Sequence, residues 1–244
     1  MNITSHTTLG AIVANNISYA NTLYQYNLDF CCGGAQTLSE ACEEQNINVD
    51  TVIKAIEATP QAEYATALQF DAWRLDLLID YILKFHHDYI RTEGPKTYQL
   101  LDKVCQVHGA TNPKLLEVRT LFAASLEDLF SHLNKEEMVL FPFIDEILKA
   151  QASRTPLPAF HCGSIENPIN AMEYEHAGEG ERFRTIAALT DNYTAPEYAC
   201  ESYKLVMDRL KQFEENLHIH IHCENNILFR KALSLQNKCL SATF

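Results

Sequence analysis

Two copies of the spacing His-x-x-x-Glu are the residues of this sequence with the clearest capacity for chemistry. They are His132 with Glu136 and His220 with Glu224. Four residues advance an α-helix by about 6 Å and rotate it by about 40°, so the two side chains of each pair converge on one point. Imidazole nitrogen and carboxylate oxygen are both metal ligands, so each pair can bind one metal centre.

Each pair interrupts a stripe of apolar residues at steps of three and four, the pattern of a helix with one buried face. Ionisable groups without partners in an apolar interior are costly, so something must satisfy them. A metal would do so, and the plainer alternative is a hydrogen-bond network or His-Glu pairing between helices. The stripes are Phe122, Leu129, His132, Glu136, Val139, Phe143 and Leu210, Phe213, Leu217, His220, Glu224, Ile227.

A metal would take further ligands from two other apolar stripes. One contains His86 and His87, between which periodicity does not choose, and the other contains His176. Four histidines and two glutamates exceed the needs of one ion, whereas two ions bridged by two carboxylates, each with two imidazoles, use all six. This count favours a dinuclear site, for iron or alternatively manganese or zinc. A ferritin-like site would carry more carboxylates than histidines.

The remaining histidines receive more ordinary interpretations. His218 and His222 point roughly 160 to 200° away from His220, so we expect them at the rim, with a zinc-binding His-x-x-x-His pair as the alternative. His108 follows another apolar segment and is a candidate hydrogen-bond partner of a ligand, although a structural role is equally open. Glu175, beside His176, is a second candidate for this supporting position.

The elements that must position these residues are helices. Helical periodicity runs along nearly the whole chain and strand alternation hardly occurs, so we expect an all-α fold. Glycine and proline seams, among them Gly94-Pro95, predict four long helices in an up-down bundle. They are placed at about 66–92, 113–149, 167–190 and 196–232. A small N-terminal unit would hold helices over Leu9–Tyr24 and Leu38–Glu44 and one that starts near Asp50, its N-cap. The expected domains are 1–58, a linker 59–65, the bundle 66–235 and a tail 236–244.

Composition excludes several classes of partner. Nineteen Lys and Arg against 32 Asp and Glu give a formal net charge of -13 in 244 residues, which disfavours binding to nucleic acid or an anionic membrane. The sequence offers neither an apolar run long enough to cross a bilayer nor an export signal at its start. We therefore expect a cytoplasmic protein, and a homodimer is compatible with the sequence.

The eight cysteines form no C-x-x-C pair, which fits a reducing compartment. Six are scattered and are interpreted as small buried hydrophobes. Cys31 and Cys32 precede Gly33-Gly34 in a turn expected just before a helix, where unpaired N-H groups would lower the thiol pKa values. Such thiolates bind metals, exchange disulfides or carry nitric oxide. The alternative is a structural turn with inert thiols.

The run Leu28-Asp29-Phe30-Cys31-Cys32-Gly33-Gly34, followed by His132-x-x-x-Glu136, Glu175-His176 and His220-x-x-x-Glu224-Asn225-Asn226, resembles the iron-sulfur cluster repair di-iron proteins. The resemblance covers nearly the whole chain and implies a hemerythrin-like bundle with two iron ions. It selects His87, with Arg91 four residues later, over His86. It also implies that Glu136 and Glu224 bridge the irons and that the Cys31-Cys32 domain takes part in cluster repair or metal delivery. Gly94 departs from the bulky apolar residue that the family commonly has before Pro95.

The expected function is repair of iron-sulfur clusters damaged by oxidative or nitrosative stress, with iron donation as one route. The expected partners are damaged iron-sulfur proteins and, in addition, nitric oxide or dioxygen. Two alternatives are a hemerythrin-type dioxygen-binding protein and an enzyme that reduces nitric oxide. The sequence leaves open whether the protein is an enzyme.

Overall fold

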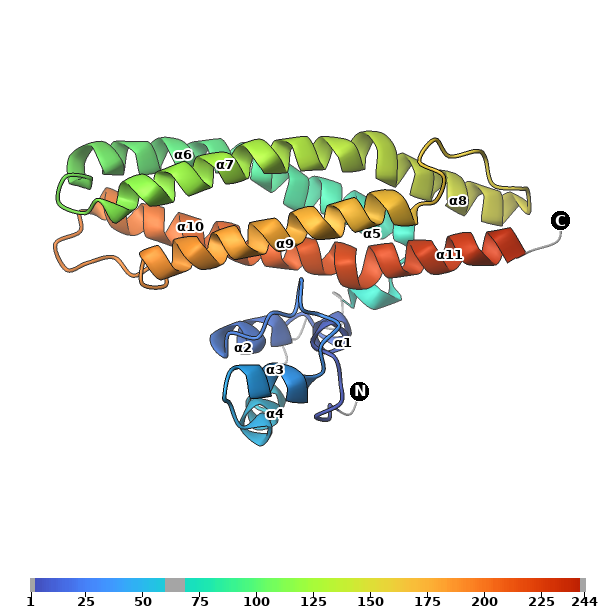
Figure 1. Cartoon of the computed structure of the whole chain (residues 1–244), viewed down its shortest axis with the longest axis horizontal. Helices are drawn as coiled ribbons and strands as arrows, with labels where there is room; N and C mark the ends of the chain where they lie inside the picture. The colour runs from blue at the N-terminus through green and yellow to red at the C-terminus, as the bar shows by residue number, and fades with distance from the viewer. Residues whose placement is uncertain (1–2, 60–68, 242–244) are drawn as a thin grey trace. The chain divides into compact units, whose positions relative to one another are not determined.

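A computed structural model of the chain describes residues 3–59 and 69–241, and it is built from helices (Figure 1). By its contacts the chain divides into two compact units, one of Met1–Asp80, Ile144–Glu166 and Ile219–Phe244 and the other of Tyr81–Phe143 and Asn167–His218. The prediction of an all-α fold with a helical bundle and a small N-terminal helical region is confirmed. Within the described residues, every helix is too short or too polar to cross a membrane.

Four long helices form the bundle: α6 (Asp88–His108), α7 (Lys114–Lys135), α9 (Glu166–Leu189) and α10 (Glu201–His222). Figure 1 shows them side by side. Phe213 on α10 packs against an aromatic ring of each of the other three helices. Its ring centroid lies 5.1 Å from that of Phe122 on α7, 5.7 Å from that of Phe183 on α9 and 6.0 Å from that of Tyr89 on α6. The apolar stripes of the sequence thus face one another and bury a common core.

The first bundle helix does not end where the sequence predicted. It begins as α5 (Leu75–Tyr81), and α6 then runs through Gly94 and Pro95 to His108. A Cβ at Gly94 would lie 2.6 Å from Leu126 Cδ2 on α7, so the glycine marks a close approach of two helices. A proline removes only one backbone hydrogen bond, and here the helix continues past it. The predicted start of this helix at residue 66 lies outside the described residues.

Each long helix, together with the helical segments that continue it along the chain, forms one rod of the bundle. Three of the rods contain a π-helical segment: η3 (Ile82–His87), η4 (Glu136–Leu140) and η5 (Cys223–Leu228). Beyond them, α8 (Phe141–Ser153) and α11 (Phe229–Ser241) continue the second and fourth rods. A π turn holds one residue more than an α turn, so the buried face moves by one position. Leu140 is buried and Val139 only half-buried, which corrects the predicted stripe.

The N-terminal helices are α1 (Leu9–Asn15), α2 (Tyr19–Gln25), α3 (Leu38–Glu44) and α4 (Val49–Glu57), and a 3-10 turn, η2 (Phe70–Ala72), precedes α5. The single helix predicted over Leu9–Tyr24 is divided in two. Asn16 adopts an extended conformation and its side chain accepts a hydrogen bond from the Ser18 N-H, which ends α1.

The cap of α4 also differs from the prediction. Asn48, and not Asp50, is the N-cap, and its side chain accepts a hydrogen bond of 2.8 Å from the Asp50 N-H. At the other end of the chain, the predicted tail is helical as far as Ser241, and residues 242–244 lie outside the described part. All but the first residue of the linker predicted at 59–65 also lies outside it, so the two domain boundaries stay predictions.

Candidate metal centre

Three imidazoles and one carboxylate meet inside the bundle. The Nε2 atoms of His87 and His132 each lie 3.4 Å from Oε2 of Glu136, the first residue of η4. His132 Nε2 also lies 3.0 Å from Nε2 of His176 on α9. All four side chains are buried. Nitrogen and oxygen atoms that point at one another in this way are typical of a metal-binding cluster.

Two of these histidines form a hydrogen bond through their other ring nitrogen. The partner in each case is an outer carboxylate, a glutamate that does not belong to the cluster. His87 Nδ1 lies 2.9 Å from Glu137 Oε1, and His132 Nδ1 lies 2.9 Å from Glu175 Oε2. An ionised carboxylate only accepts hydrogen bonds, so each Nδ1 is the donor and each Nε2 keeps its lone pair toward the interior. This arrangement fixes the tautomer and the ring orientation that metal-binding histidines adopt.

The outer carboxylates are themselves held by cations and stay ionised. The hydrogen bond from His132, with a further contribution from Lys135, lowers the pKa of Glu175 to about 2 although burial works in the opposite direction. Burial also opposes ionisation of Glu137, but hydrogen bonds from His87 and Arg91 outweigh it and lower the pKa of that carboxyl group. Arg91 lies 3.1 Å from Glu137.

The second His-x-x-x-Glu pair spans the junction of α10 and η5. His220 Nε2 lies 3.0 Å from Glu224 Oε1, and both side chains are fully buried. The π-helical segment begins at Cys223, so Glu224 lies in its first turn, as Glu136 lies in the first turn of η4. Each bridging candidate therefore sits at the start of a widened turn.

Two groups of buried residues could each hold a metal ion, and they share both glutamates. In each group, one ligand atom of every residue lies within 4.8 Å of the others. The bundle thus contains buried His and Glu clusters of the kind that form a metal site. The groups are His87, Glu136, His220, Glu224 and His132, Glu136, His176, Glu224.

Among the predicted supporting residues, Glu175 contacts a ligand candidate and His108 does not. His108 ends α6, about 30 Å along that helix from His87. Its Nε2 lies 3.3 Å from Cys200 Sγ and its ring packs against Tyr203. Of the two roles that the sequence left open for His108, the structural one therefore fits and support of a ligand does not, because an apolar segment before a histidine does not tell which end of the bundle it occupies.

Sequence reasoning missed Glu137 and misplaced His222. Glu137 precedes an exposed Met138 and lies off the apolar stripe, so only its place after Glu136 could have pointed to it. His222 does point away from the ligand face, but it is buried and not at the rim. Its ring packs edge-on against Phe30, and burial lowers its pKa to about 4 despite an opposing backbone interaction with Phe30. His218 is half-buried.

His86, the other member of the paired histidines, is buried too, so burial does not separate it from His87. Its Nδ1 lies 3.1 Å from Oδ1 of Asn216 on α10. His86 falls outside both groups of four. The choice of His87 over His86, which the resemblance favours, is consistent with the contact between His87 and Glu136.

The two vicinal cysteines do not have the environment that the sequence predicted. They lie in the loop before α3, whose first residue is Leu38, so neither occupies the helix start. A hydrogen bond with Cys32, together with burial and the nearby Asp29, raises the pKa of the Cys31 thiol well above its ordinary value. The expected lowering of its pKa is thus wrong in this structure. All eight cysteines are free of disulfide bonds.

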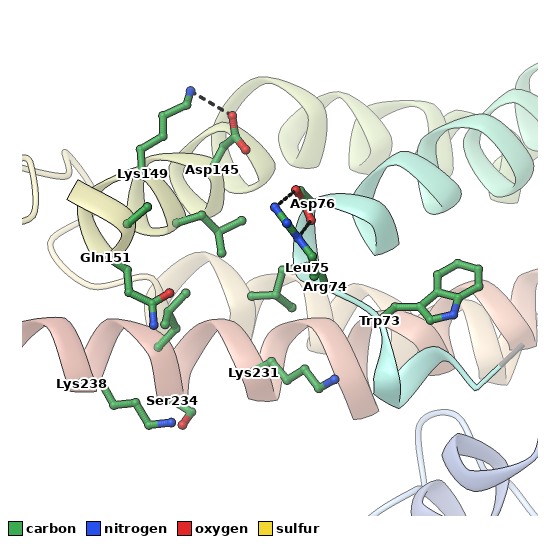
Figure 2. A pocket seen from close by; sticks show the side chains of 13 residues that line it. Trp73, Arg74, Leu75, Asp76, Asp145, Lys149, Gln151, Lys231, Ser234 and Lys238 are labelled. Atoms are coloured by element: carbon green, nitrogen blue, oxygen red, sulfur yellow. Dashed lines mark hydrogen bonds and ion pairs between the residues drawn. The ribbon is translucent and has the colours of Figure 1, made fainter. Parts of the chain in front are cut away.

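A cavity of about 400 Å³ opens beside two of the ligand candidates, His132 and His176. Lys135 and Arg182 are also among its lining residues. A larger cavity, of about 680 Å³, lies between the start of α5, α8 and α11 (Figure 2). Its basic residues include Arg74 and Lys149, which are paired with Asp76 and Asp145. Its described lining contains none of the six ligand candidates.

Known proteins resemble this chain in both parts. Residues 5–59 match the family ScdA_N, described as a domain of unknown function (DUF542), and residues 78–232 match the hemerythrin HHE cation binding domain. The iron-sulfur cluster repair protein YtfE of Yersinia pseudotuberculosis serotype IB (strain PB1/+) is 36% identical over 228 residues, which cover 92% of this chain and 96% of that protein. The protein of the same name from Yersinia pestis (strain Pestoides F) has the same identity and coverage.

Proposed function

Because this chain belongs to the family of the iron-sulfur cluster repair protein YtfE, we propose that it restores damaged iron-sulfur clusters with the help of a di-iron centre in its bundle. The observation that carries the proposal is the pair of buried groups that share Glu136 and Glu224. Two shared carboxylates and two separate pairs of imidazoles are what two bridged ions require. The family match adds the repair role, which geometry alone does not contain.

The donor set fits iron. Its six members offer borderline imidazole nitrogens and hard carboxylate oxygens, a combination that suits iron and also accepts manganese or zinc. The proposed terminal ligands are His87 with His220 on one ion and His132 with His176 on the other, and Glu136 and Glu224 are the proposed bridges. Bound iron would supply redox and Lewis-acid chemistry at this place, and it is also the element that a damaged cluster has lost.

The surrounding residues orient and seal the centre. Glu137 and Glu175 hold the rings of His87 and His132, so that a metal meets nitrogens that are already aimed inward. Phe141 stacks on His87, with ring centroids 5.7 Å apart, and excludes water from that side. The preorganised ligands favour binding because little side-chain freedom is lost when the ion enters.

The cavity beside His132 and His176 is the proposed route of exchange. Its lining includes two proposed ligands, and its 400 Å³ would admit a hydrated ion or a small molecule. Lys135 and Arg182 on its wall are both paired with carboxylates, which limits the positive charge that an incoming cation would meet. Iron could therefore leave on this side during donation.

Substitution of the proposed bridges tests the function. Glu136→Gln and Glu224→Gln should each lower the iron content of protein purified without oxygen from two ions per chain, because an amide is a weak, neutral ligand. Both should also impair reactivation of an enzyme with a damaged [4Fe-4S] cluster. The measurements are metal analysis and the repair assay on the same samples.

Glu214→Gln provides the matched control. Glu214 is a buried carboxylate of α10 that lies outside both groups and outside the lining of the proposed exchange cavity. This variant should keep its iron and its repair activity. Full iron retention in both bridge variants would contradict the ligand assignment, and iron binding without any repair would contradict the function.

A further inference from the structure

The loop that carries the vicinal cysteines brings together three atoms that bind metals. Cys31 Sγ lies 3.9 Å from Cys32 Sγ and 3.2 Å from Asp29 Oδ1. The three residues form a third group whose ligand atoms all lie within 4.8 Å of one another. None of them belongs to the two groups in the bundle, so this cluster calls for its own explanation.

The backbone of the loop is shaped so that the two thiols face the same way. Side chains of adjacent residues in an extended chain point in opposite directions. Here Asp29 Oδ1 accepts hydrogen bonds from the N-H groups of Cys31, at 3.1 Å, and of Cys32, at 2.9 Å. This turn folds the chain around the carboxylate and turns both sulfur atoms toward it.

The distances match those of a tetrahedral metal site. With metal-sulfur bonds of about 2.3 Å and a metal-oxygen bond of about 2.0 Å, two sulfur ligands lie about 3.8 Å apart and sulfur and oxygen about 3.5 Å apart. The observed separations of 3.9 Å and 3.2 Å are close to these values. A disulfide would need the two sulfur atoms about 2.0 Å apart, far closer than they are.

The loop is also fixed by hydrogen bonds from η5, the π-helical segment that follows α10. The Asn226 side-chain amide donates hydrogen bonds to the carbonyl oxygens of Phe30, at 3.2 Å, and Cys31, at 3.1 Å. A Cβ at Gly34 would overlap Asn226 Oδ1, so glycine is needed for this close approach. The two hydrogen bonds fix the backbone of the loop at the cysteines. A loop fixed in this way loses little freedom when a ligand binds.

We propose that Asp29, Cys31 and Cys32 form a second metal site, separate from the bundle, that takes a divalent cation such as Zn²⁺ or Fe²⁺ through one carboxylate oxygen and two thiolates. On binding, each thiol releases its proton to water and a metal-sulfur bond takes its place. The hydrogen bond from Cys31 Sγ to Asp29 is replaced by the shared ion. Two thiolates with one carboxylate suit these borderline cations better than Mg²⁺ or Ca²⁺.

Three protein ligands leave one coordination position of a tetrahedral ion open, as in catalytic rather than structural zinc sites. Cys31 is buried, whereas Asp29 and Cys32 are half-buried, so the open position is reachable from solvent. The site is thus suited to pass an ion to another ligand set. This inference does not depend on the proposed repair function, because a metal can be detected there whether or not repair occurs.

Cobalt is the probe that distinguishes this site from the bundle. Thiolate ligands give Co²⁺ an intense charge-transfer absorption, which the nitrogen and oxygen ligands of the bundle cannot give. Iron-loaded full-length protein, titrated with Co²⁺ without oxygen, should develop this absorption and saturate at one ion per chain. Absence of the absorption from the wild-type protein at millimolar Co²⁺ would overturn the proposal.

Variants assign the ligands. Cys31→Ala and Cys32→Ala should each lose the absorption, whereas Cys42→Ala and Cys200→Ala should keep it. Cys200 is the sharper control because it is exposed and lies beside His108, so it is a competing thiol for cobalt. An absorption that survives in the first two variants and disappears in Cys200→Ala would place the metal elsewhere and refute the site.

Asp29→Asn separates the metal from the turn. An asparagine can still accept both backbone hydrogen bonds through Oδ1, so the loop should keep its shape, but the negative charge is lost. Cobalt affinity should fall at least about tenfold. Bundle iron content and the helical circular dichroism should stay unchanged, which shows that the chain is folded. Unchanged cobalt affinity would refute the role of Asp29 as a ligand.

Discussion

At the scale of the residue, the metal centre depends on side chains that do not themselves belong to the two groups. Glu137 and Glu175 decide which nitrogen of His87 and His132 faces the interior. Without these acceptors each ring could rotate or adopt the other tautomer, and its Nε2 would no longer be presented to an ion. Metal binding should therefore be sensitive to two carboxylates on the outside of the site.

Glu137→Gln and Glu175→Gln should each weaken iron binding about 10-fold to 100-fold without abolishing it. An amide oxygen can still accept a hydrogen bond, but it lacks the charge that strengthens the bond from imidazole. Competition with a chromogenic chelator measures the affinity. Glu181→Gln is the control, since Glu181 is an exposed residue of α9 that pairs with Arg184. Equal affinities in all three variants would contradict the role given to the outer carboxylates.

The residues that the sequence identified are those whose polarity conflicts with their expected burial. His132, Glu136, His220 and Glu224 stand out because each interrupts an apolar stripe. Glu137 does not, since a charged residue beside the stripe is ordinary. The thiol pKa of Cys31 could not be anticipated either, because burial and the contact with Asp29 depend on how the loop folds.

At the scale of the element, helix packing explains the main departures from the sequence prediction. By residue type, Gly94 and Pro95 predict the end of a helix. The packed bundle nevertheless tolerates the missing hydrogen bond of Pro95, and the small Gly94 allows close contact with Leu126. The widened turns were also beyond a periodicity argument, because a single extra residue leaves most of a stripe unchanged. The four long helices themselves were predictable because their stripes are long.

A pair of glycine substitutions tests this explanation. Gly178→Ala in α9 should raise the free energy of unfolding by up to about 1 kcal/mol, because alanine favours helix and an added Cβ there meets nothing within 4 Å. Gly94→Ala has the same gain in propensity, but its Cβ would displace Leu126, and overpacking costs about 1 to 3 kcal/mol. We expect this variant to be neutral or less stable than the wild-type protein.

Chemical denaturation of the two variants under the same metal conditions provides the measurement. If Gly94→Ala stabilised the protein as much as Gly178→Ala does, the approach of α6 to α7 would not be limited by the glycine. The structural reason given for the uninterrupted α6 would then be wrong.

At the scale of the whole molecule, metal binding and folding should be coupled. The six proposed ligands come from four rods of the bundle and are brought together only in the folded chain. An ion that binds the folded state alone stabilises it by about 3 to 4 kcal/mol when free metal exceeds the dissociation constant 100-fold to 1,000-fold. Removal of the metal should therefore lower the stability of the whole bundle.

Guanidinium denaturation of iron-loaded and metal-free protein, both without oxygen, measures this effect. The midpoint should move to lower denaturant in the metal-free sample, and the shift should be smaller for Glu136→Gln, which binds iron less well. An identical midpoint for loaded and metal-free wild-type protein would mean that the ligands are not a folding-dependent site.

One stretch of helix, from His220 to Asn226, has consequences for anyone who recombines relatives of this protein. Residues on one of its sides are proposed to bind iron. On the other side, His222 packs edge-on against the ring of Phe30, and Asn226 bonds to the backbone of the cysteine loop at Phe30 and Cys31, beside Gly34, where no side chain would fit. The amino-terminal segment therefore cannot be exchanged between relatives independently of this helix. A chimera that takes residues 1–59 from another organism should import positions 222 and 226 from the same parent.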